Sequence, residues 1–155
     1  MLISTIKQLT KTLENNIKKN QNIKNCSKYL NNYNGKDYKK KIQFNNINYN
    51  RLKLFQNNDF EIMLICWNKN QETKIHNHPK NGCLYKVLEG TLIEQRYNNI
   101  FKSSSVSSTR APSLSSFINN NQKSNYIDND LGIHKIIAKE KSVSLHIYSP
   151  PLFYK

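Results

Sequence analysis

The sequence lacks the features of membrane proteins and of secreted proteins. It has no apolar run approaching the roughly 20 residues that a membrane-spanning helix needs. Residues 1–16 contain an apolar stretch too short for a secretory signal peptide, and no small-residue cleavage site follows it. We therefore expect a soluble, cytoplasmic protein.

Cysteine is also scarce. The three cysteines, Cys26, Cys66 and Cys83, are an odd number and show no CxxC spacing. This pattern argues against a disulfide framework and favours a reducing, intracellular environment. Cys66 lies in an apolar run, where small buried thiols are common, so we expect Cys66 and Cys26 to be unreactive.

Acidic residues and arginine are few, although the chain is strongly basic. Its 155 residues include 24 Lys+Arg and 10 Asp+Glu, a formal net charge of +14, but the only arginines are Arg51, Arg96 and Arg110. Such a charge could indicate a nucleic-acid or membrane surface. Phosphate-binding sites usually favour arginine, however, and the lysines are scattered apart from residues 39–41. We favour a lysine-rich solvated surface and expect neither nucleic acid nor membrane as a partner.

The length and the periodicity of the first 40 residues predict how the chain begins. A chain of 155 residues suits one domain with a substantial core. Apolar residues at three- and four-residue spacing predict an amphipathic helix, at Ile6, Leu9, Leu13 and Ile17. A second, shorter helix is expected within 18–40, anchored by Tyr29, Leu30, Tyr33 and Tyr38.

From residue 41 onward the pattern is typical of β-strands. Residues 41–55 alternate between apolar and polar, and 60–67 (FEIMLICW) form the continuous apolar run of a buried strand. Further short strands are expected at 73–78, 83–97, 125–130 and 142–151, with a turn at Glu89-Gly90 and a loop in the serine run 103–108. The chain should be mainly β, an antiparallel barrel or sandwich at 41–155 after a helical segment at 1–40.

The strand SVSLHIY, residues 142–148, has two unlike faces. Because alternate side chains of a strand point to opposite sides, one face is apolar and carries Val143, Leu145 and Ile147. The other face is polar and carries Ser144, His146 and Tyr148. The polar face could point to water. It could instead line a barrel interior, where its hydrogen bonds must be satisfied internally.

Histidine is rare, and its placement is informative. Of four histidines, His76 and His78 are two residues apart, so that in a strand they would share a face and could bind one metal ion. An HxH pair alone is weak evidence, but Cys83 and Gly90 follow it and His134 lies downstream. The alternative is that these are surface histidines. We favour a metal site because so few histidines fall into two short motifs.

These motifs resemble those of the cupin superfamily, namely HxH, an acidic residue and Gly, then Gly shortly before a third His. Here they read His76-Asn77-His78, Cys83, Gly90 and Gly132-Ile133-His134. A cysteine at the usual acidic position resembles the pattern of the cysteine dioxygenase family. The similarity extends from Tyr49 to Pro151 through YNR (49–51), MLICW (63–67), IHNHPKNGC (75–83), NYIDNDLGIH (125–134) and SVSLHIYSPP (142–151). It implies a cupin-type antiparallel β-barrel, or jelly roll, with N-terminal α-helices.

The resemblance also implies a metal site and a substrate site. His76, His78 and His134 would hold one Fe(II), which imidazole suits, and three ligands leave coordination positions open. Arg51 would bind the substrate carboxylate, with Tyr49 as a second contact. A guanidinium group matches a carboxylate with two parallel hydrogen bonds. From its position alone, Arg51 could equally be a surface residue.

Four further residues take roles from the same resemblance. Cys83 and Tyr148 correspond to a pair that forms a thioether cross-link in part of the family. His146 would hydrogen-bond Tyr148, with Ser144 behind it. Ser149-Pro150 would be a cis peptide, a form that X-Pro bonds adopt readily.

The resemblance implies that the protein is an enzyme, which oxidises L-cysteine with O2 to cysteine sulfinic acid at a mononuclear non-haem iron. A dioxygenase for another small thiol, such as 3-mercaptopropionate, is an alternative. Relatives that use mercaptopropionate carry their carboxylate arginine elsewhere, so Arg51 favours cysteine. A second alternative is a metal-binding cupin without turnover, because the chain ends at Lys155, earlier than the family usually does. We expect a monomer.

Overall fold

The computed structural model describes residues 2–20, 22–97, 114–120 and 123–152. The serine run at 103–108 lies outside these ranges. The chain begins with four helical segments: α1 (Ile6–Asn20), the 3-10 helix η1 (Ile23–Cys26), α2 (Ser27–Asn31) and the 3-10 helix η2 (Asp37–Lys41). Thr5 caps α1, since its hydroxyl accepts a hydrogen bond from the Gln8 amide at 3.1 Å. Both predicted helices are confirmed.

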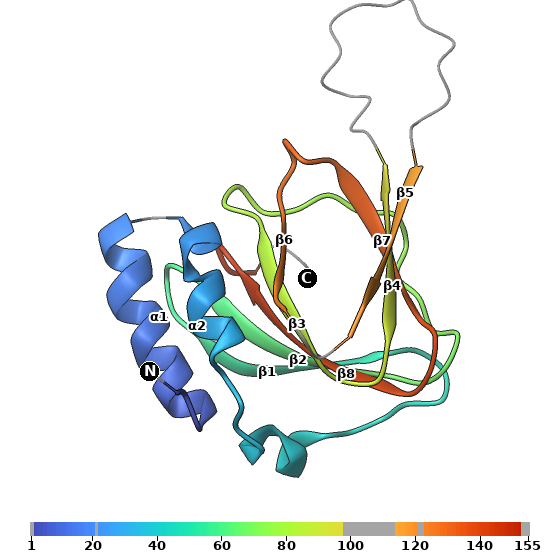
Figure 1. Ribbon diagram of the computed structural model, residues 1–155, viewed down its shortest axis with the longest axis horizontal. Helices are drawn as coiled ribbons and strands as arrows, with labels where there is room; N and C mark the ends of the chain where they lie inside the picture. The colour runs from blue at the N-terminus through green and yellow to red at the C-terminus, as the bar shows by residue number, and fades with distance from the viewer. Residues whose placement is uncertain (1, 21, 98–113, 121–122, 153–155) are drawn as a thin grey trace, which may run out of the picture.

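The described residues then form eight strands in two antiparallel sheets. The strands are β1 (Asn50–Gln56), β2 (Glu61–Trp67), β3 (Cys83–Glu89), β4 (Leu92–Tyr97), β5 (Leu114–Asn119), β6 (Asn125–Ile127), β7 (Ile133–Ala138) and β8 (Ser142–Tyr148). One sheet has the order β1-β2-β8-β3-β6 and the other β5-β4-β7. In Figure 1 the two sheets form the walls of a barrel, and α1 and α2 lie outside it beside the five-stranded sheet. The mainly β, cupin-type antiparallel barrel with N-terminal helices is confirmed.

Two predicted strand segments are wrong in extent. The region before β1 is not a strand, and the first strand begins at Asn50. Ile42 and Phe44 alternate with polar residues because their partly buried side chains pack against the core, while the segment itself does not pair with another strand. Residues 73–78 form only an isolated bridge, His76 to His134, and a separate hydrogen bond from the Thr73 amide to β7. The segment therefore follows β7 without a continuous ladder.

The other differences concern the later strands. Strand β6 ends at Ile127, because the Asp128 carboxylate accepts hydrogen bonds from the amides of Asp130 and Leu131 at 3.0 and 2.9 Å and so forms a turn. Strands β5 and β7 were not among the predicted strands. The predicted turn at Glu89-Gly90 is confirmed, with Gly90 at a φ of 75° that favours glycine.

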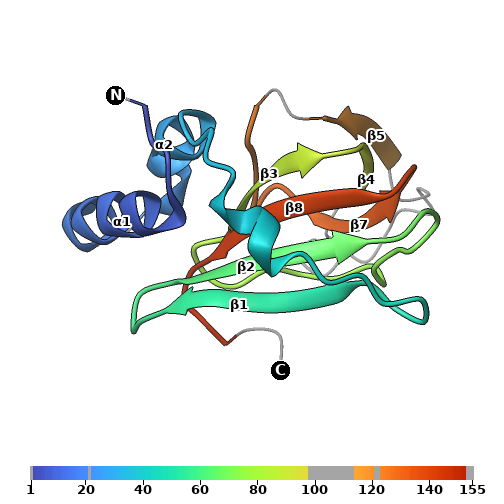
Figure 2. The same cartoon turned by 90° about the horizontal axis from the view of Figure 1, so that it is seen from below.

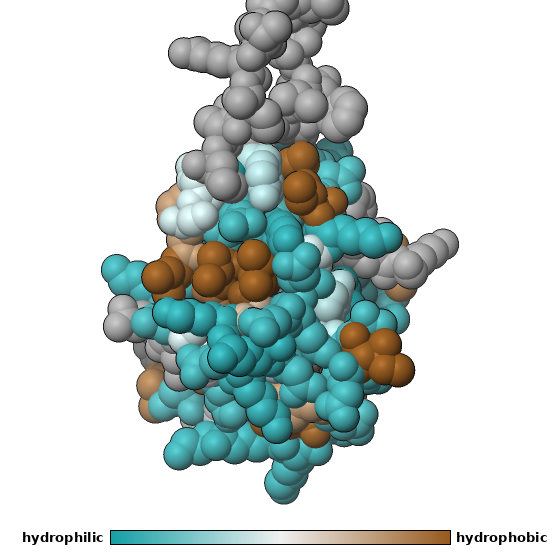
Figure 3. Space-filling model, turned by 90° about the vertical axis from the view of Figure 1, so that its right-hand side faces the viewer, coloured by the Kyte–Doolittle hydropathy of each residue, from teal (hydrophilic) through white to brown (hydrophobic). Residues whose placement is uncertain are grey.

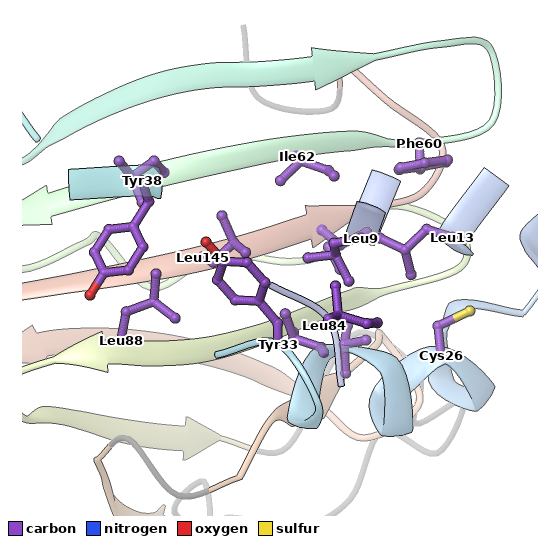
Figure 4. Close-up of a cluster of buried hydrophobic side chains, with 14 of the residues drawn as sticks. Leu9, Leu13, Cys26, Tyr33, Tyr38, Phe60, Ile62, Leu84, Leu88 and Leu145 are labelled. Atoms are coloured by element: carbon purple, nitrogen blue, oxygen red, sulfur yellow. The ribbon is translucent and has the colours of Figure 1, made fainter. Parts of the chain in front are cut away.

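A mainly apolar core fills the space between the helices and the outer face of the five-stranded sheet. Figure 4 shows Leu9 and Leu13 of α1 directed at Ile62 and Leu145 of the sheet. The face of β8 that carries Val143, Leu145 and Ile147 belongs to this core, as predicted. Figure 2 shows the helices to one side of the sheet, with the interior of the barrel on the other side of it.

A buried lysine attaches the helical segment to the barrel. The Lys86 ammonium donates to the backbone carbonyls of Asn31 and Tyr33 at 3.0 and 2.9 Å, at the end of α2. A cation is favourable there because the last carbonyls of a helix carry partial negative charge. The division into a helical segment at 1–40 and one barrel domain at 41–155 stays a prediction.

One face of the molecule is mainly hydrophilic (Figure 3). Figure 3 shows the side of the molecule next to the three-stranded sheet, where apolar patches are small and separated by polar side chains. Phe117 and Ile118 of β5 are 45% and 68% exposed. None of the helices in the described part of the chain has the length and the hydropathy to cross a membrane.

Candidate metal centre

Three histidines converge inside the barrel. His76 and His78 come from the segment before β3, and His134 comes from β7. One nitrogen of each ring lies within 4.8 Å of the others, and the backbone bridge between His76 and His134 fixes the approach. His78 and His134 are buried, and His76 is half-buried. The structure thus brings together the three predicted metal ligands.

Hydrogen bonds determine which nitrogen of His76 and of His134 faces the centre. Nδ1 of His76 lies 2.8 Å from the carbonyl oxygen of Lys74, which can only accept, so this nitrogen carries the proton. Nδ1 of His134 donates in the same way to a carboxylate oxygen of Glu94 at 2.7 Å. Nε2 of His76 therefore carries a lone pair, and Nε2 of His134 faces it at 3.0 Å. A proton or a metal ion between these two nitrogens would hold them together.

His78 provides the third nitrogen. Among the residues that the structure describes, neither ring nitrogen of this buried side chain has a hydrogen-bond partner. Its backbone is held firmly, because the Asn129 amide side chain donates to the His78 carbonyl and accepts from its N–H, both at 2.8 Å. Buried polar atoms are normally satisfied. An orphaned imidazole at this position fits a metal ligand.

The electrostatic environment keeps His76 and His78 neutral. Burial, together with the neighbouring His134, lowers the pKa of His76 to about 4 and that of His78 to about 2. Neutral imidazole is the form that coordinates a metal. A donor set of three imidazole nitrogens suits a divalent transition metal and adds no negative charge to it.

The polar face of β8 lines the barrel interior. Ser144, His146 and Tyr148 are all buried. The indole N–H of Trp67 donates to the Ser144 hydroxyl at 2.9 Å, which lies 2.8 Å from Nε2 of His146. Nδ1 of His146 lies 3.3 Å from the Tyr148 hydroxyl. The row is therefore a connected hydrogen-bond chain, and the interpretation that it faces water is wrong.

Cys83 and Tyr148 lie side by side. They are directly opposite each other in the antiparallel pairing of β3 with β8. The Cys83 sulfur is 3.9 Å from Nδ1 of His146, and burial raises the pKa of this thiol. Burial, with Arg51 next in importance, lowers the pKa of His146 well below its ordinary value. The peptide bond Ser149-Pro150 after β8 is cis, as expected.

A cavity of about 550 Å³ opens beside the histidines. Both predicted substrate residues line it, together with His76, His134, His146 and Tyr148. The guanidinium carbon of Arg51 lies 5.4 Å from the centre of the Tyr148 ring. Tyr49 stacks on Trp67 with ring centres 4.6 Å apart. A small molecule in this cavity would reach the metal centre, Arg51 and Tyr148 at once.

Sequence reasoning missed three residues of the site. Trp67 supports Ser144, Glu94 holds His134, and Tyr85 stacks on His146 with ring centres 5.1 Å apart. Of these three residues, only Glu94 could have been found from the sequence. It lies two positions after Leu92 in a strand, so the carboxylate is on the same inward face as this leucine. Trp67 and Tyr85 are hidden within apolar runs.

Comparison with solved structures defines the class of protein. A Thermus thermophilus protein superposes with a TM-score of 0.55 at 16% identity, over 74% of this chain and 95% of that one. A cupin superfamily protein of Desulfitobacterium hafniense gives 0.53 at 14% identity, over 70% and 83%. The protein is thus a cupin by fold, with a three-histidine group inside its barrel.

Sequence comparison identifies the family. The profile described as cysteine dioxygenase type I matches residues 1–154, and the chain belongs to this family. Cysteine dioxygenase type 1 of Danio rerio is 30% identical over 154 residues, which are 97% of this chain and 73% of that protein. The Homo sapiens protein of the same name is 31% identical over 113 residues, 70% of this chain. The match spans 54%, about half, of the human protein's length.

Proposed function

We propose that the protein is a thiol dioxygenase that oxidises L-cysteine with O2 to cysteine sulfinic acid, at Fe(II) held by His76, His78 and His134. The observation that carries the proposal is the convergence of three histidine nitrogens at one end of a cavity that Arg51 also lines. The reaction balances without a further reductant. Sulfur loses four electrons, O2 gains four, and both oxygen atoms end on sulfur.

The three-histidine group fits the metal that this chemistry needs. When bound, Fe(II) would supply a Lewis-acidic centre with open positions that favours a thiolate and reacts with O2. The protein's part is to hold three imidazoles in place. Lys74 and Glu94 fix the tautomers of two of them, and Asn129 fixes the backbone of His78.

Arg51 and Tyr49 would bind the substrate. In the proposal the guanidinium group of Arg51 pairs with the carboxylate of cysteine through two parallel hydrogen bonds. Tyr49 lies on the same wall of the cavity, and its hydroxyl would be a second contact for the carboxylate. Anchoring the carboxylate at this end directs the thiol of the substrate toward the histidines.

The Ser144–His146–Tyr148 row would position a proton at the Tyr148 hydroxyl. The indole of Trp67 can only donate, so Nε2 of His146 is the natural acceptor for the Ser144 hydroxyl proton. His146 then carries its own proton on Nδ1 and donates it toward the Tyr148 oxygen. In this arrangement the Tyr148 hydroxyl keeps its proton for donation to Cys83 or to a molecule in the cavity that Tyr148 lines.

We further propose that Cys83 and Tyr148 form a thioether bond. Their direct cross-strand pairing supports it. The new carbon–sulfur bond replaces the S–H bond of Cys83 and one ring C–H bond of Tyr148, and O2 takes up the two protons and two electrons to form hydrogen peroxide. Intact mass spectrometry of denatured protein should show the loss of two hydrogens, and peptide mapping should join the two segments. Persistence of this mass loss in Cys83→Ser would contradict the assignment.

The activity is tested by anaerobic reconstitution with Fe(II), followed by cysteine and air. We expect O2 uptake and sulfinate formation in a one-to-one ratio. Product from 3-mercaptopropionate but not from cysteine would favour the alternative substrate. Bound iron without any product would favour a metal-binding cupin without turnover.

A further inference from the structure

Glu94, which fixes the tautomer of His134, is a fully buried carboxylate with further hydrogen-bond partners. Besides the 2.7 Å bond from His134, it accepts hydrogen bonds from Nε and Nη2 of Arg96, at 2.9 and 3.1 Å. The Tyr85 hydroxyl adds a bond at 2.8 Å. Burial by itself would raise the pKa of Glu94, but the bonds from His134 and Arg96 outweigh it and hold the pKa at about 2.

Tyr85 has a single possible hydrogen-bond direction. The side-chain amide of Asn119 donates to its oxygen at 2.8 Å, so the hydroxyl proton of Tyr85 goes to Glu94. The ring of Tyr85 lies flat on His146, with an interplanar angle of 11°. One side chain therefore contacts both the carboxylate behind His134 and the imidazole of the β8 row.

His76 and His134 differ in the group that accepts the hydrogen bond from their Nδ1 atoms. His76 donates to a neutral backbone carbonyl, whereas His134 donates to an ionised carboxylate. A carboxylate behind a metal-bound imidazole fixes its tautomer and raises its basicity, and losing such a partner typically lowers metal affinity about 10- to 100-fold. Burying a carboxylate is costly unless it is fully paired, which Arg96 and Tyr85 accomplish here.

We propose that Glu94 and Tyr85 are positioning residues of the metal centre. Glu94 directs Nε2 of His134 at the metal, and Tyr85 couples this carboxylate to the plane of His146. The inference rests on the proposed function, because it takes the three histidines to be the metal ligands. It adds that the metal centre and the proton-positioning row are aligned through one shared pair of side chains.

The test is anaerobic titration with Co(II), followed by its visible absorption spectrum, which reports ligand geometry independently of activity. Glu94→Gln should bind Co(II) about 10- to 100-fold more weakly and shift the spectrum. Tyr85→Phe keeps the ring on His146 but removes the hydroxyl, so a smaller, several-fold loss is expected. Glu89→Gln is the matched control, because Glu89 contacts Tyr38 and Lys39, and it should leave both readouts unchanged.

Affinity within twofold of wild type and an unchanged spectrum for Glu94→Gln would overturn the role of Glu94, and the same result for Tyr85→Phe would overturn the coupling. Either result leaves the proposed function intact, because wild type still binds the metal. Wild-type protein that binds no Co(II) would instead refute the metal centre and the inference with it. If Glu94→Gln does not fold, Glu94→Asp takes its place with the same expected and overturning results.

Discussion

The two faces of β8 are equally buried but differ in chemistry. On the side of the helices, Leu145 and its apolar neighbours pack in the hydrophobic core, where complementary shape and volume suffice and these side chains need no hydrogen-bond partner. Toward the barrel interior, Ser144, His146 and Tyr148 are linked by hydrogen bonds to each other and to Trp67. Burying such groups costs free energy unless each finds a partner. The outer face therefore stabilises the fold through packing. The inner face contributes less to stability and provides the polar groups of the site.

The largest effect in the barrel interior, which the inner face of β8 lines, should come from His76→Ala. Loss of one of three metal ligands should leave the purified protein with almost no iron and reduce O2 uptake to background. Because the side chain is only half-buried, the metal-free protein should lose about 1 kcal/mol of unfolding free energy. Metal analysis and urea denaturation measure the two effects. Retention of stoichiometric iron would remove His76 from the ligand set.

Leu145→Ala should give the opposite result. Truncating a fully buried leucine should lower the free energy of unfolding by about 2–5 kcal/mol through lost burial and a residual cavity. The protein that remains folded should bind Co(II) as tightly as wild type, because Leu145 lies on the far side of the sheet from the histidines. Denaturation and metal titration of the same sample provide the comparison. Weakened metal binding in folded protein would show that the two faces are not independent.

A change at the substrate end of the cavity should be milder. Arg51→Ala should raise the KM for cysteine about tenfold to a hundredfold, since a charged hydrogen bond contributes about 1.5–3 kcal/mol. Iron content should not change. Lys53→Ala is the matched control, because Lys53 is an exposed basic residue on the same strand. An unchanged KM in Arg51→Ala would refute its role as the carboxylate anchor.

A pH dependence of stability should come from the buried histidines of the barrel interior. Burial lowers the pKa of His76, His78 and His146 from 6.5. Below pH 6.5 the unfolded chain therefore binds protons that the folded, metal-free protein does not. Its unfolding free energy should fall with falling pH, by at most about 1.4 kcal/mol per pH unit for each histidine. Denaturation at pH 7.5, 6 and 5 checks this, and equal stability at all three would contradict the neutral histidines.

The sequence was most informative where periodicity and rare residues coincide. The amphipathic helix, the alternation in β8 and the histidine motifs followed from spacing, and the structure brings the three histidines together. Spacing could not show that 73–78 follow β7 with a single bridge, since that depends on the tertiary approach of His76 to His134. Nor could it show that Glu94 lies behind His134, because side chains 40 residues apart in the chain meet there.

Segments rich in polar residues were the least predictable. Strand β5, with its two serines and an asparagine, has a weak intrinsic preference for a strand and forms through pairing with β4. Strand β7 contains His134, Lys135 and a run of aliphatic residues, so alternation did not identify it. In both strands the tertiary pairing decides the structure.

The most direct test of the central claim is a single turnover of iron-loaded protein with cysteine under ¹⁸O2. The account predicts cysteine sulfinic acid that carries two labelled oxygen atoms, because both atoms of O2 end on the sulfur. A product labelled from water, or cystine as the sole product, would contradict a thiol dioxygenase at the three-histidine centre.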